Sequence, residues 1–286
     1  MAATVPTTAT ELEVLWQKAA QYMEQLGADL SEQPSNESVV WPLGGVATYL
    51  TTIFVLWLWM RNKPAGTFDK ALRWPLVIHN YILCLFSLAL VVGIGYRVVT
   101  IYTSCAHGLY AVYCGCTEAP ELSKAMTFWA YLFYLSKYYE LFDTVFLVLR
   151  KRPLTFLHVY HHAIVMPMCW FAINQGIIMG WITCFNNAFV HVIMYYYFAE
   201  QARGAGPKWW RKYITTIQIV QFMLDCGTSV FFGYFWYVGT PCHGTIEAWV
   251  AANAIGISFF FLFLNFYVKQ YTADKRDRAT KQRKQE

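Results

Sequence analysis

Residues 154–173 read LTFLHVYHHAIVMPMCWFAI, an apolar run of the length that a helix needs to cross a bilayer. Three histidines interrupt this run. His158, His161 and His162 are spaced i, i+3 and i+4, so they share one face of a helix. Ionisable side chains are energetically expensive inside a membrane, and a cluster of them indicates a functional site. The stretch therefore predicts a membrane-embedded helix with a polar site on it.

The composition of the whole chain is typical of a membrane protein. Of its 286 residues, 57% are hydrophobic and 14% are charged, against about 25% charged residues in soluble domains. We predict an all-α, polytopic membrane protein, with an N-terminal segment (1–42), a seven-helix catalytic domain (43–269) and a basic tail (270–286). The seven apolar runs are 44–60, 76–99, 125–149, 154–173, 176–198, 213–238 and 247–268.

The positive charges fall mainly on one side of these runs. Eighteen of the 22 Lys and Arg residues lie in the loops after the first, third and fifth runs and in the tail. The positive-inside rule predicts that these segments are cytosolic, with a lumenal N-terminus and a cytosolic C-terminus. The net charge of +5 thus reflects topology and does not indicate nucleic-acid binding.

The segments expected on the lumenal side contain four cysteines and a glycosylation sequon. Cys242 could form a disulfide with one of Cys105, Cys114 or Cys116, and the sequence does not decide which. Asn36 begins an Asn-Glu-Ser sequon and could be glycosylated. The C-terminal Arg-Lys-Gln-Glu is close to a dilysine retrieval signal, which points to the endoplasmic reticulum.

Three further runs carry polar side chains at helical spacing. They are Lys137, Glu140, Asp143 and Thr144 in the third run, Asn187, His191 and Tyr195 in the fifth, and Thr215, Gln218 and Gln221 in the sixth. The direction of each span puts all these sets in the cytosolic half, level with the histidines. A site there could take a water-soluble reactant from the cytosol, while the apolar lumenal halves form a closed tunnel for a hydrocarbon chain. For the charged residues of the third run, a purely structural ion-pair network is the alternative.

Four segments, in order along the chain, resemble the signature boxes of the ELO family of fatty-acid elongases, which are membrane 3-ketoacyl-CoA synthases. The boxes are KxxExxDT at 137–144, HxxHH at 158–162, NxxxHxxMYxYY at 187–198 and TxxQxxQ at 215–221. One departure is Phe198, which replaces the last Tyr of the third box. The segment 156–162 is similar to the branch that acts on polyunsaturated substrates. The resemblance implies residence in the endoplasmic reticulum membrane and seven helices, six of them forming an inverted barrel around a substrate tunnel.

The resemblance also implies the reaction. Malonyl-CoA and a long-chain acyl-CoA condense to a 3-ketoacyl-CoA, CO2 and CoA, with His161 carrying the acyl group as an acyl-imidazole. His191 is then a base or enolate partner, and His158 and His162 orient His161 or bind the malonyl thioester. No metal or organic cofactor is needed for this chemistry.

Other residues and partners follow from the same resemblance. Supporting hydrogen bonds or charges are expected from Lys137, Glu140, Asp143, Thr144, Asn187, Tyr195, Gln218 and Gln221. The CoA phosphates could bind Lys208, Arg211 and Lys212. The expected partners are the bilayer, the two CoA substrates, the ketoreductase, dehydratase and enoyl reductase of the elongation cycle, and a second copy of the chain.

Two other functions are compatible with parts of this pattern. A membrane di-iron desaturase or hydroxylase also uses HxxHH, but such enzymes need several histidine clusters, and this chain has only one. A seven-helix transporter or receptor would also have buried charges. Here, however, the polar residues gather at one depth and do not form a path across the membrane.

Overall fold

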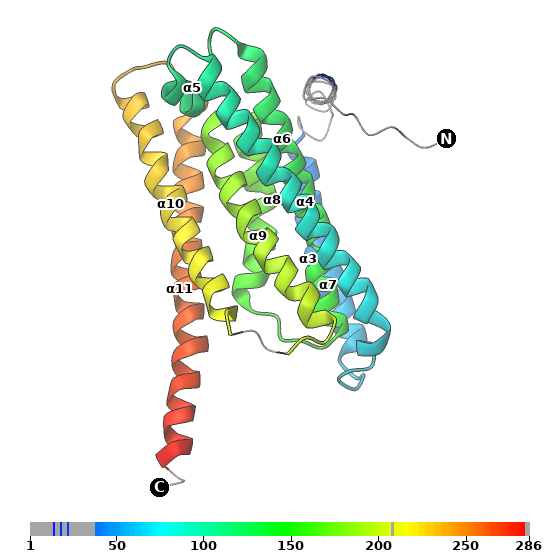
Figure 1. Ribbon diagram of the computed structural model, residues 1–286. Helices are drawn as coiled ribbons and strands as arrows, with labels where there is room; N and C mark the ends of the chain where they lie inside the picture. Colours follow the sequence, from blue (N-terminus) through cyan, green and yellow to red (C-terminus); the bar gives the residue numbers. More distant parts are fainter. Residues whose placement is uncertain (1–13, 15–17, 19–21, 23–37, 207–208, 284–286) are drawn as a thin grey trace.

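The computed structural model describes residues 14, 18, 22, 38–206 and 209–283, with side chains described as far as Tyr271. Among these residues all regular structure is helical, and the long helices run side by side with the short α5 at one end (Figure 1). The elements are α3 (Val40–Met60), α4 (Asp69–Ser104), α5 (Gly108–Cys114), α6 (Pro120–Glu140), α7 (Phe142–Leu149), α8 (Phe156–Asn174), η1 (Ile178–Gly180), α9 (Trp181–Ala202), α10 (Arg211–Tyr237) and α11 (Ile246–Arg283).

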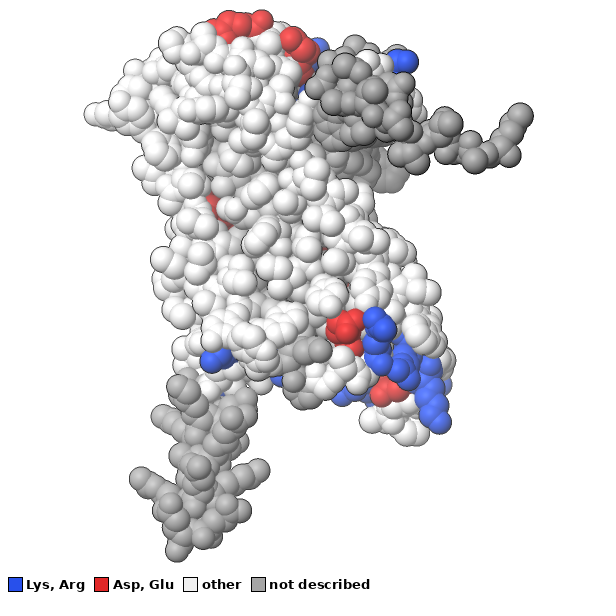
Figure 2. Space-filling model, in the orientation of Figure 1, with Lys and Arg blue, Asp and Glu red and all other residues white. Residues whose placement is uncertain are grey.

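Six helices in the described part of the chain are long and apolar enough to cross a membrane: α3, α4, α8, α9 together with η1, α10 and α11. Figure 2 shows a broad central belt that is largely free of charged side chains, with Lys and Arg gathered at the end opposite α5. The predicted all-α, multi-pass architecture is therefore confirmed. The third predicted span does not meet the same criterion, because tyrosines, Lys137 and Glu140 dilute the apolar run of α6.

The third predicted span is divided into two helices. α6 ends at Glu140 and α7 begins at Phe142. Around Leu141 the backbone hydrogen bonds join residues three apart instead of four. The Leu141 N–H donates to the Tyr138 carbonyl (3.4 Å), and the Leu141 carbonyl accepts from the Thr144 N–H (3.1 Å). Such three-residue spacing turns the chain faster than an α-helix does. The KxxExxDT box is therefore divided between two helices, with Lys137 and Glu140 on α6 and Asp143 and Thr144 on α7.

The histidine-bearing helix α8 begins where its sequence provides a cap. The side chain of Thr155 accepts a hydrogen bond from the backbone N–H of His158 at 3.2 Å. This N-cap satisfies one of the free N–H groups of the first turn and places the histidines in the first two turns. At its other end α8 stops at Asn174, and Gly176, with φ +63°, allows the turn into η1.

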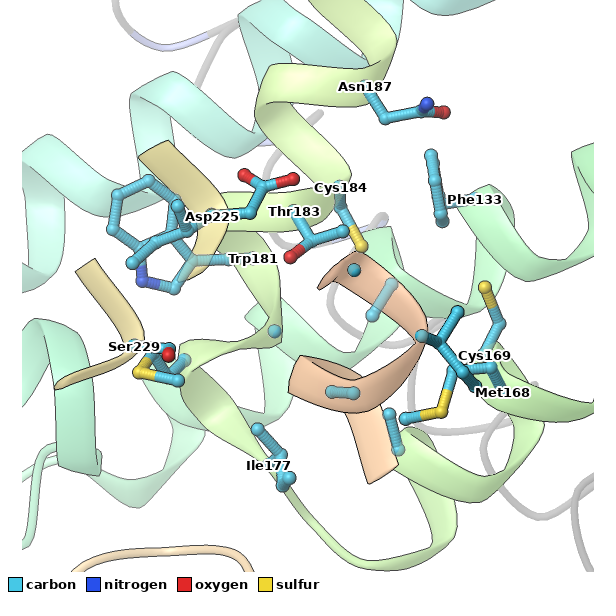
Figure 3. A pocket seen from close by; sticks show the side chains of 18 of the residues that line it. Phe133, Met168, Cys169, Ile177, Trp181, Thr183, Cys184, Asn187, Asp225 and Ser229 are labelled. Atoms are coloured by element: carbon cyan, nitrogen blue, oxygen red, sulfur yellow. The ribbon is translucent and has the colours of Figure 1, made fainter. Parts of the chain in front are cut away.

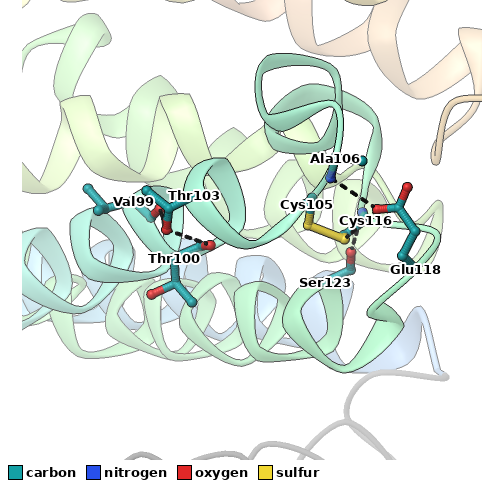
Figure 4. Close-up of a disulfide and its surroundings, with 8 residues drawn as sticks. All are labelled: Val99, Thr100, Thr103, Cys105, Ala106, Cys116, Glu118 and Ser123. Carbon is teal, nitrogen blue, oxygen red and sulfur yellow. Dashed lines mark hydrogen bonds between the residues drawn. A yellow bond between two sulfur atoms is a disulfide. The ribbon is translucent and has the colours of Figure 1, made fainter.

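Two disulfides fix α5 to the end of the bundle. Cys105 pairs with Cys116 (Figure 4), and Cys114 pairs with Cys242, which precedes α11. The indole N–H of Trp181 at the start of α9 also donates to the carbonyl of Val112 at 2.9 Å. The structure thus gives Cys242 one of the three partners that its sequence allowed, and it adds a second, local bridge.

We expect Cys242→Ser to lower the free energy of unfolding by about 2–5 kcal/mol, because the lost bridge joins residues far apart in the chain. Thermal unfolding in detergent micelles, followed by circular dichroism, would measure the effect. The matched control is Cys84→Ser, since Cys84 is a free cysteine that should leave the transition within about 0.5 kcal/mol of wild type. Equal transitions for both variants would contradict this prediction.

Candidate active site

A polar cavity lies between α4, α6, α7, α8, α9, α10 and α11. The predicted site residues that line it are Glu140, Asp143, His158, His161, His162, Asn187, His191, Tyr195, Thr215, Gln218 and Gln221. The structure thus brings together polar side chains from all four sequence boxes. Lys137 and Thr144 do not line the cavity but lie behind it, 3% and 0% exposed.

A second, mainly apolar cavity extends from His161 to η1, and Figure 3 shows part of its lining. Phe133, Met168 and Cys169 line it from α6 and α8, and Trp181 and Cys184 line it from α9. Its far end is bordered by η1 and by Trp249 of α11. This lining is the kind that apolar ligands occupy.

The two cavities meet at a small group of residues. His161, Asn187, Gln221 and Phe222 line both of them. Of the three histidines in the HxxHH box, only His161 belongs to both linings. A reactive group at this junction can contact an apolar chain on one side and a polar reactant on the other.

Glu140 connects Lys137 to the second catalytic candidate, His191. The Nζ of Lys137 donates to Glu140 Oε1 (2.7 Å) and to Asn187 Oδ1 (3.0 Å). Nδ1 of His191 lies 3.6 Å from the same Oε1. Glu140 is 2% exposed, and its Oε2 has no hydrogen-bond partner among the described residues. Lys137 and Glu140 therefore form a buried ion pair beside His191.

Asp143 makes different contacts from those of Glu140. Its Oδ1 accepts from Nε2 of His79 on α4 (2.7 Å), and its Oδ2 accepts from the Tyr195 hydroxyl (2.7 Å). It therefore orients His79 and not a histidine of the HxxHH box. His79 is 4% exposed and belongs to the same polar network.

Thr144 contacts the HxxHH box from behind. Its Oγ1 lies 2.8 Å from Nε2 of His158 and 3.0 Å from the hydroxyl of Tyr49 on α3. The imidazole ring of His162 lies beside Tyr49 and His158, with ring centroids 6.3 Å and 4.5 Å away. Sequence reasoning missed Tyr49, because a tyrosine in an apolar span is usually interpreted as packing or as part of an interfacial belt.

Asp225 on α10 is a second residue that sequence reasoning missed. It lines the apolar cavity with Asn187 and Ser229 (Figure 3), and its Oδ1 accepts from Asn186 Nδ2 at 2.7 Å. Gln221, one turn earlier, donates to the other carboxylate oxygen at 3.4 Å. Its i+4 spacing from the TxxQxxQ box was the available signal, since an acid in an apolar span needs partners.

Of the predicted CoA-binding residues, only one lies at the cavity among those that the structure describes. Arg211 lines the polar cavity, whereas Lys212 is exposed and lies over the ring of Tyr213. Lys208 and the sequon residue Asn36 lie outside the described residues. The structure adds Arg150 and Arg152 to the cavity lining, so three guanidinium groups border it.

Comparisons with known proteins agree with the four boxes. The model of the GNS1/SUR4 family, ELO, matches residues 34–279. Fatty acid elongase A of Dictyostelium discoideum is 35% identical over 238 residues, which cover 82% of this chain and 84% of that protein. Fatty acid elongase sre1 of the same organism is 34% identical over 243 residues, covering 84% of this chain and 86% of that protein.

A relative from an animal gives the same result. Very long chain fatty acid elongase 6 of Drosophila melanogaster is 32% identical over 245 residues, covering 83% of this chain and 74% of that protein. These matches span the helices that line both cavities and confirm the resemblance, so the desaturase and the transporter or receptor are no longer needed as explanations. The chain belongs to the GNS1/SUR4 (ELO) family and is a fatty-acid elongase, an enzyme of the 3-ketoacyl-CoA synthase type.

Proposed function

We propose that this elongase condenses malonyl-CoA with a long-chain acyl-CoA through an acyl-imidazole on His161. The observation that carries the proposal is the position of His161, which lines both the apolar and the polar cavity. In this arrangement the acyl chain occupies the apolar cavity, and the two CoA thioesters arrive in turn through the polar one. A site shielded from water also protects a reactive acyl group from hydrolysis.

The reaction has two halves. A ring nitrogen of His161 attacks the acyl thioester carbonyl, and the CoA thiolate leaves and takes up a proton. Malonyl-CoA then loses CO2, and the resulting enolate attacks the acyl-imidazole to form the new carbon–carbon bond and free His161. Groups that donate hydrogen bonds to the enolate oxygen lower the barrier of this second half.

The surrounding residues have distinct roles in this proposal. His191, close to the neutralised Glu140, acts as the base or enolate partner. Asn187, Gln218 and Gln221 offer amide groups to thioester oxygens, and His162 supports the ring of His161, whose centroid is 5.3 Å away. The arginines bordering the polar cavity and Lys212 and Lys208 bind the CoA phosphates, for which bidentate Arg–phosphate pairs are well suited.

The proposal includes an orientation and a compartment. We propose seven spans, with α6 and α7 together as the third, and α4 together with α6 to α11 surrounding the cavities as an inverted barrel of six spans. The packing of α6 against α4, α8 and α9 supports this count. The basic end faces the cytosol and the disulfide-bonded end faces the lumen of the endoplasmic reticulum, which is oxidising enough to keep such bridges.

Further parts of the same proposal concern the termini and the partners. Residues 1–42 form a lumenal segment, in which Asn36 is available for glycosylation, and residues 270–286 form a basic cytosolic tail. The 3-ketoacyl product requires a ketoreductase, then a dehydratase and an enoyl reductase, in the same membrane. A second copy of the chain is a further proposed partner.

A condensation assay tests this function directly. Purified protein receives labelled malonyl-CoA and a panel of acyl-CoAs, from saturated C16 to polyunsaturated C20 chains, and products are identified by mass spectrometry. We expect acyl-dependent formation of a 3-ketoacyl-CoA and release of labelled CO2, with the panel separating saturated from polyunsaturated preference. Folded protein that forms no such product with any acyl-CoA would overturn the proposal.

The apolar cavity makes a prediction about chain length. Ala172 lines it on the same helix as His161, eleven residues farther along, which is about 16 Å of helix. We expect Ala172→Phe to exclude the longest acyl-CoAs, with about a tenfold or greater loss, while shorter chains react at wild-type rates.

The control for this variant is Ala254→Phe, which adds the same bulk at an exposed position of α11 outside both cavity linings. Product-length profiles for the two variants provide the measurement. A profile of Ala172→Phe that matches the control at every chain length would show that the acyl chain does not pass Ala172.

A further inference from the structure

A chain of three side chains connects α3 to the histidine cluster. The Tyr49 hydroxyl is 3.0 Å from Thr144 Oγ1, which is 2.8 Å from His158 Nε2. Tyr49 is 3% exposed and Thr144 is fully buried. Among the described residues, α3 contributes nothing to the lining of either cavity, although it packs against α7 and α8. Among the described residues, the Tyr49 hydroxyl therefore reaches the site by hydrogen bonds only through Thr144.

The protons in this chain can be assigned from hydrogen-bond satisfaction. The Tyr49 hydroxyl has one proton, and Thr144 is its only hydrogen-bond partner among the described residues. If His158 Nε2 donated to Thr144, then either the Tyr49 or the Thr144 proton would be buried without an acceptor. An unpaired buried donor is costly, and more so where no water can reach it. The arrangement that satisfies every group has Tyr49 donating to Thr144 and Thr144 donating to His158 Nε2.

This assignment fixes the tautomer of His158. A ring nitrogen that accepts a hydrogen bond carries no proton, so the single proton of neutral His158 is on Nδ1. Among the described residues nothing accepts a hydrogen bond from this Nδ1, and the side chain lines the polar cavity. His191 has a different neighbour, because its own Nδ1 lies near the carboxylate of Glu140. The Thr144 hydroxyl thus contacts the ring of His158, whereas the Glu140 carboxylate lies near the ring of His191.

We propose that Tyr49 and Thr144 are positioning residues that hold His158 as a neutral imidazole, whose Nδ1–H donates to the enolate oxygen of the decarboxylating malonyl thioester. This inference rests on the proposed condensation and deepens it. The inference predicts different effects on the two halves of the reaction. The enolate forms only in the second half, so transfer of the acyl group from CoA to His161 does not need this donor.

The test compares Tyr49→Phe, Thr144→Val and Thr144→Ser, each of which changes the hydroxyl chain with little change in volume. Two rates are measured for each variant: CoA release from acyl-CoA alone, and 3-ketoacyl-CoA formation after malonyl-CoA is added. The control is Tyr102→Phe, which removes a hydroxyl from an exposed tyrosine on α4 outside both cavity linings.

We expect Thr144→Val to lower kcat for condensation about 100-fold and Tyr49→Phe about 10-fold, because loss of an oxyanion donor reaches this range. CoA release and the KM for malonyl-CoA stay at wild-type values. Thr144→Ser keeps a hydroxyl that can accept and donate, so it retains condensation within about twofold of wild type.

Three results would overturn the inference. They are a Tyr49→Phe rate equal to that of the Tyr102→Phe control, a Thr144→Ser rate as low as that of Thr144→Val, or a parallel loss of both half-reactions. Failure of the proposed function itself looks different, because wild-type protein would then form no 3-ketoacyl-CoA at all.

Discussion

We expect replacement of His161 by Ala to lower the condensation rate by about 10⁴-fold or more, because it removes the proposed nucleophile and with it the covalent route. The same variant should fail in the first half-reaction. Incubation with acyl-CoA alone should give no burst of CoA and no acyl adduct on the peptide that contains residues 156–174. Wild-type protein, quenched and digested under mild conditions, should show that adduct by mass spectrometry.

A matched control separates loss of the nucleophile from loss of the fold. His107→Ala removes an exposed histidine from the loop before α5, outside both cavity linings. His107→Ala should retain wild-type activity. Both variants should unfold at the same temperature, which would show that His161→Ala is folded. Substantial acyl transfer by His161→Ala would contradict this assignment and point to another residue at the junction of the two cavities as the nucleophile.

The second large effect concerns stability. We expect Lys137→Met to destabilise the protein by about 3–5 kcal/mol, because it leaves the 2%-exposed carboxylate of Glu140 without its charged partner. Thermal unfolding of the purified protein measures this change. An exposed lysine of the same helix provides the control, and Lys124→Met should be within about 0.5 kcal/mol of wild type.

A double variant distinguishes the charge from the shape of the pair. Lys137→Met combined with Glu140→Gln removes both charges and should recover most of the lost stability, since a neutral pair needs no buried counter-ion. Its condensation rate should remain low, because His191 has then lost the carboxylate near its Nδ1. If the double variant were as unstable as Lys137→Met alone, the single loss would come from packing and not from an unpaired charge.

Much of this site could be predicted from sequence, because its polar residues recur at i, i+3 and i+4 within apolar spans. That spacing is enough to select the residues of α8, α9 and α10 that line the polar cavity. The loop positions of the cysteines likewise limited the partner of Cys242 to three candidates, of which the structure pairs Cys114 with it.

Other features depend on tertiary contacts that no local pattern encodes. The periodicity argument assumes a continuous helix, whereas the KxxExxDT box is divided at Leu141 between α6 and α7. The partners of Asp143 and Thr144 come from other helices, which spacing alone does not identify. Tyr49 reaches Thr144 across 95 positions of sequence, and His79 reaches Asp143 across 64. Both lie in apolar spans where single polar groups are commonly interpreted as packing.

The disulfide connectivity has a consequence for how the chain is made. Cys105, Cys114 and Cys116 emerge from the ribosome close together. Cys242, the partner of Cys114, does not emerge until 128 further residues have been synthesised. At about 5–20 residues per second, synthesis leaves Cys114 without Cys242 for many seconds, beside two thiols within easy reach. During that interval Cys114 can be captured by a neighbour, and only thiol exchange would release it. The order of synthesis thus makes correct maturation dependent on disulfide exchange as well as on oxidation.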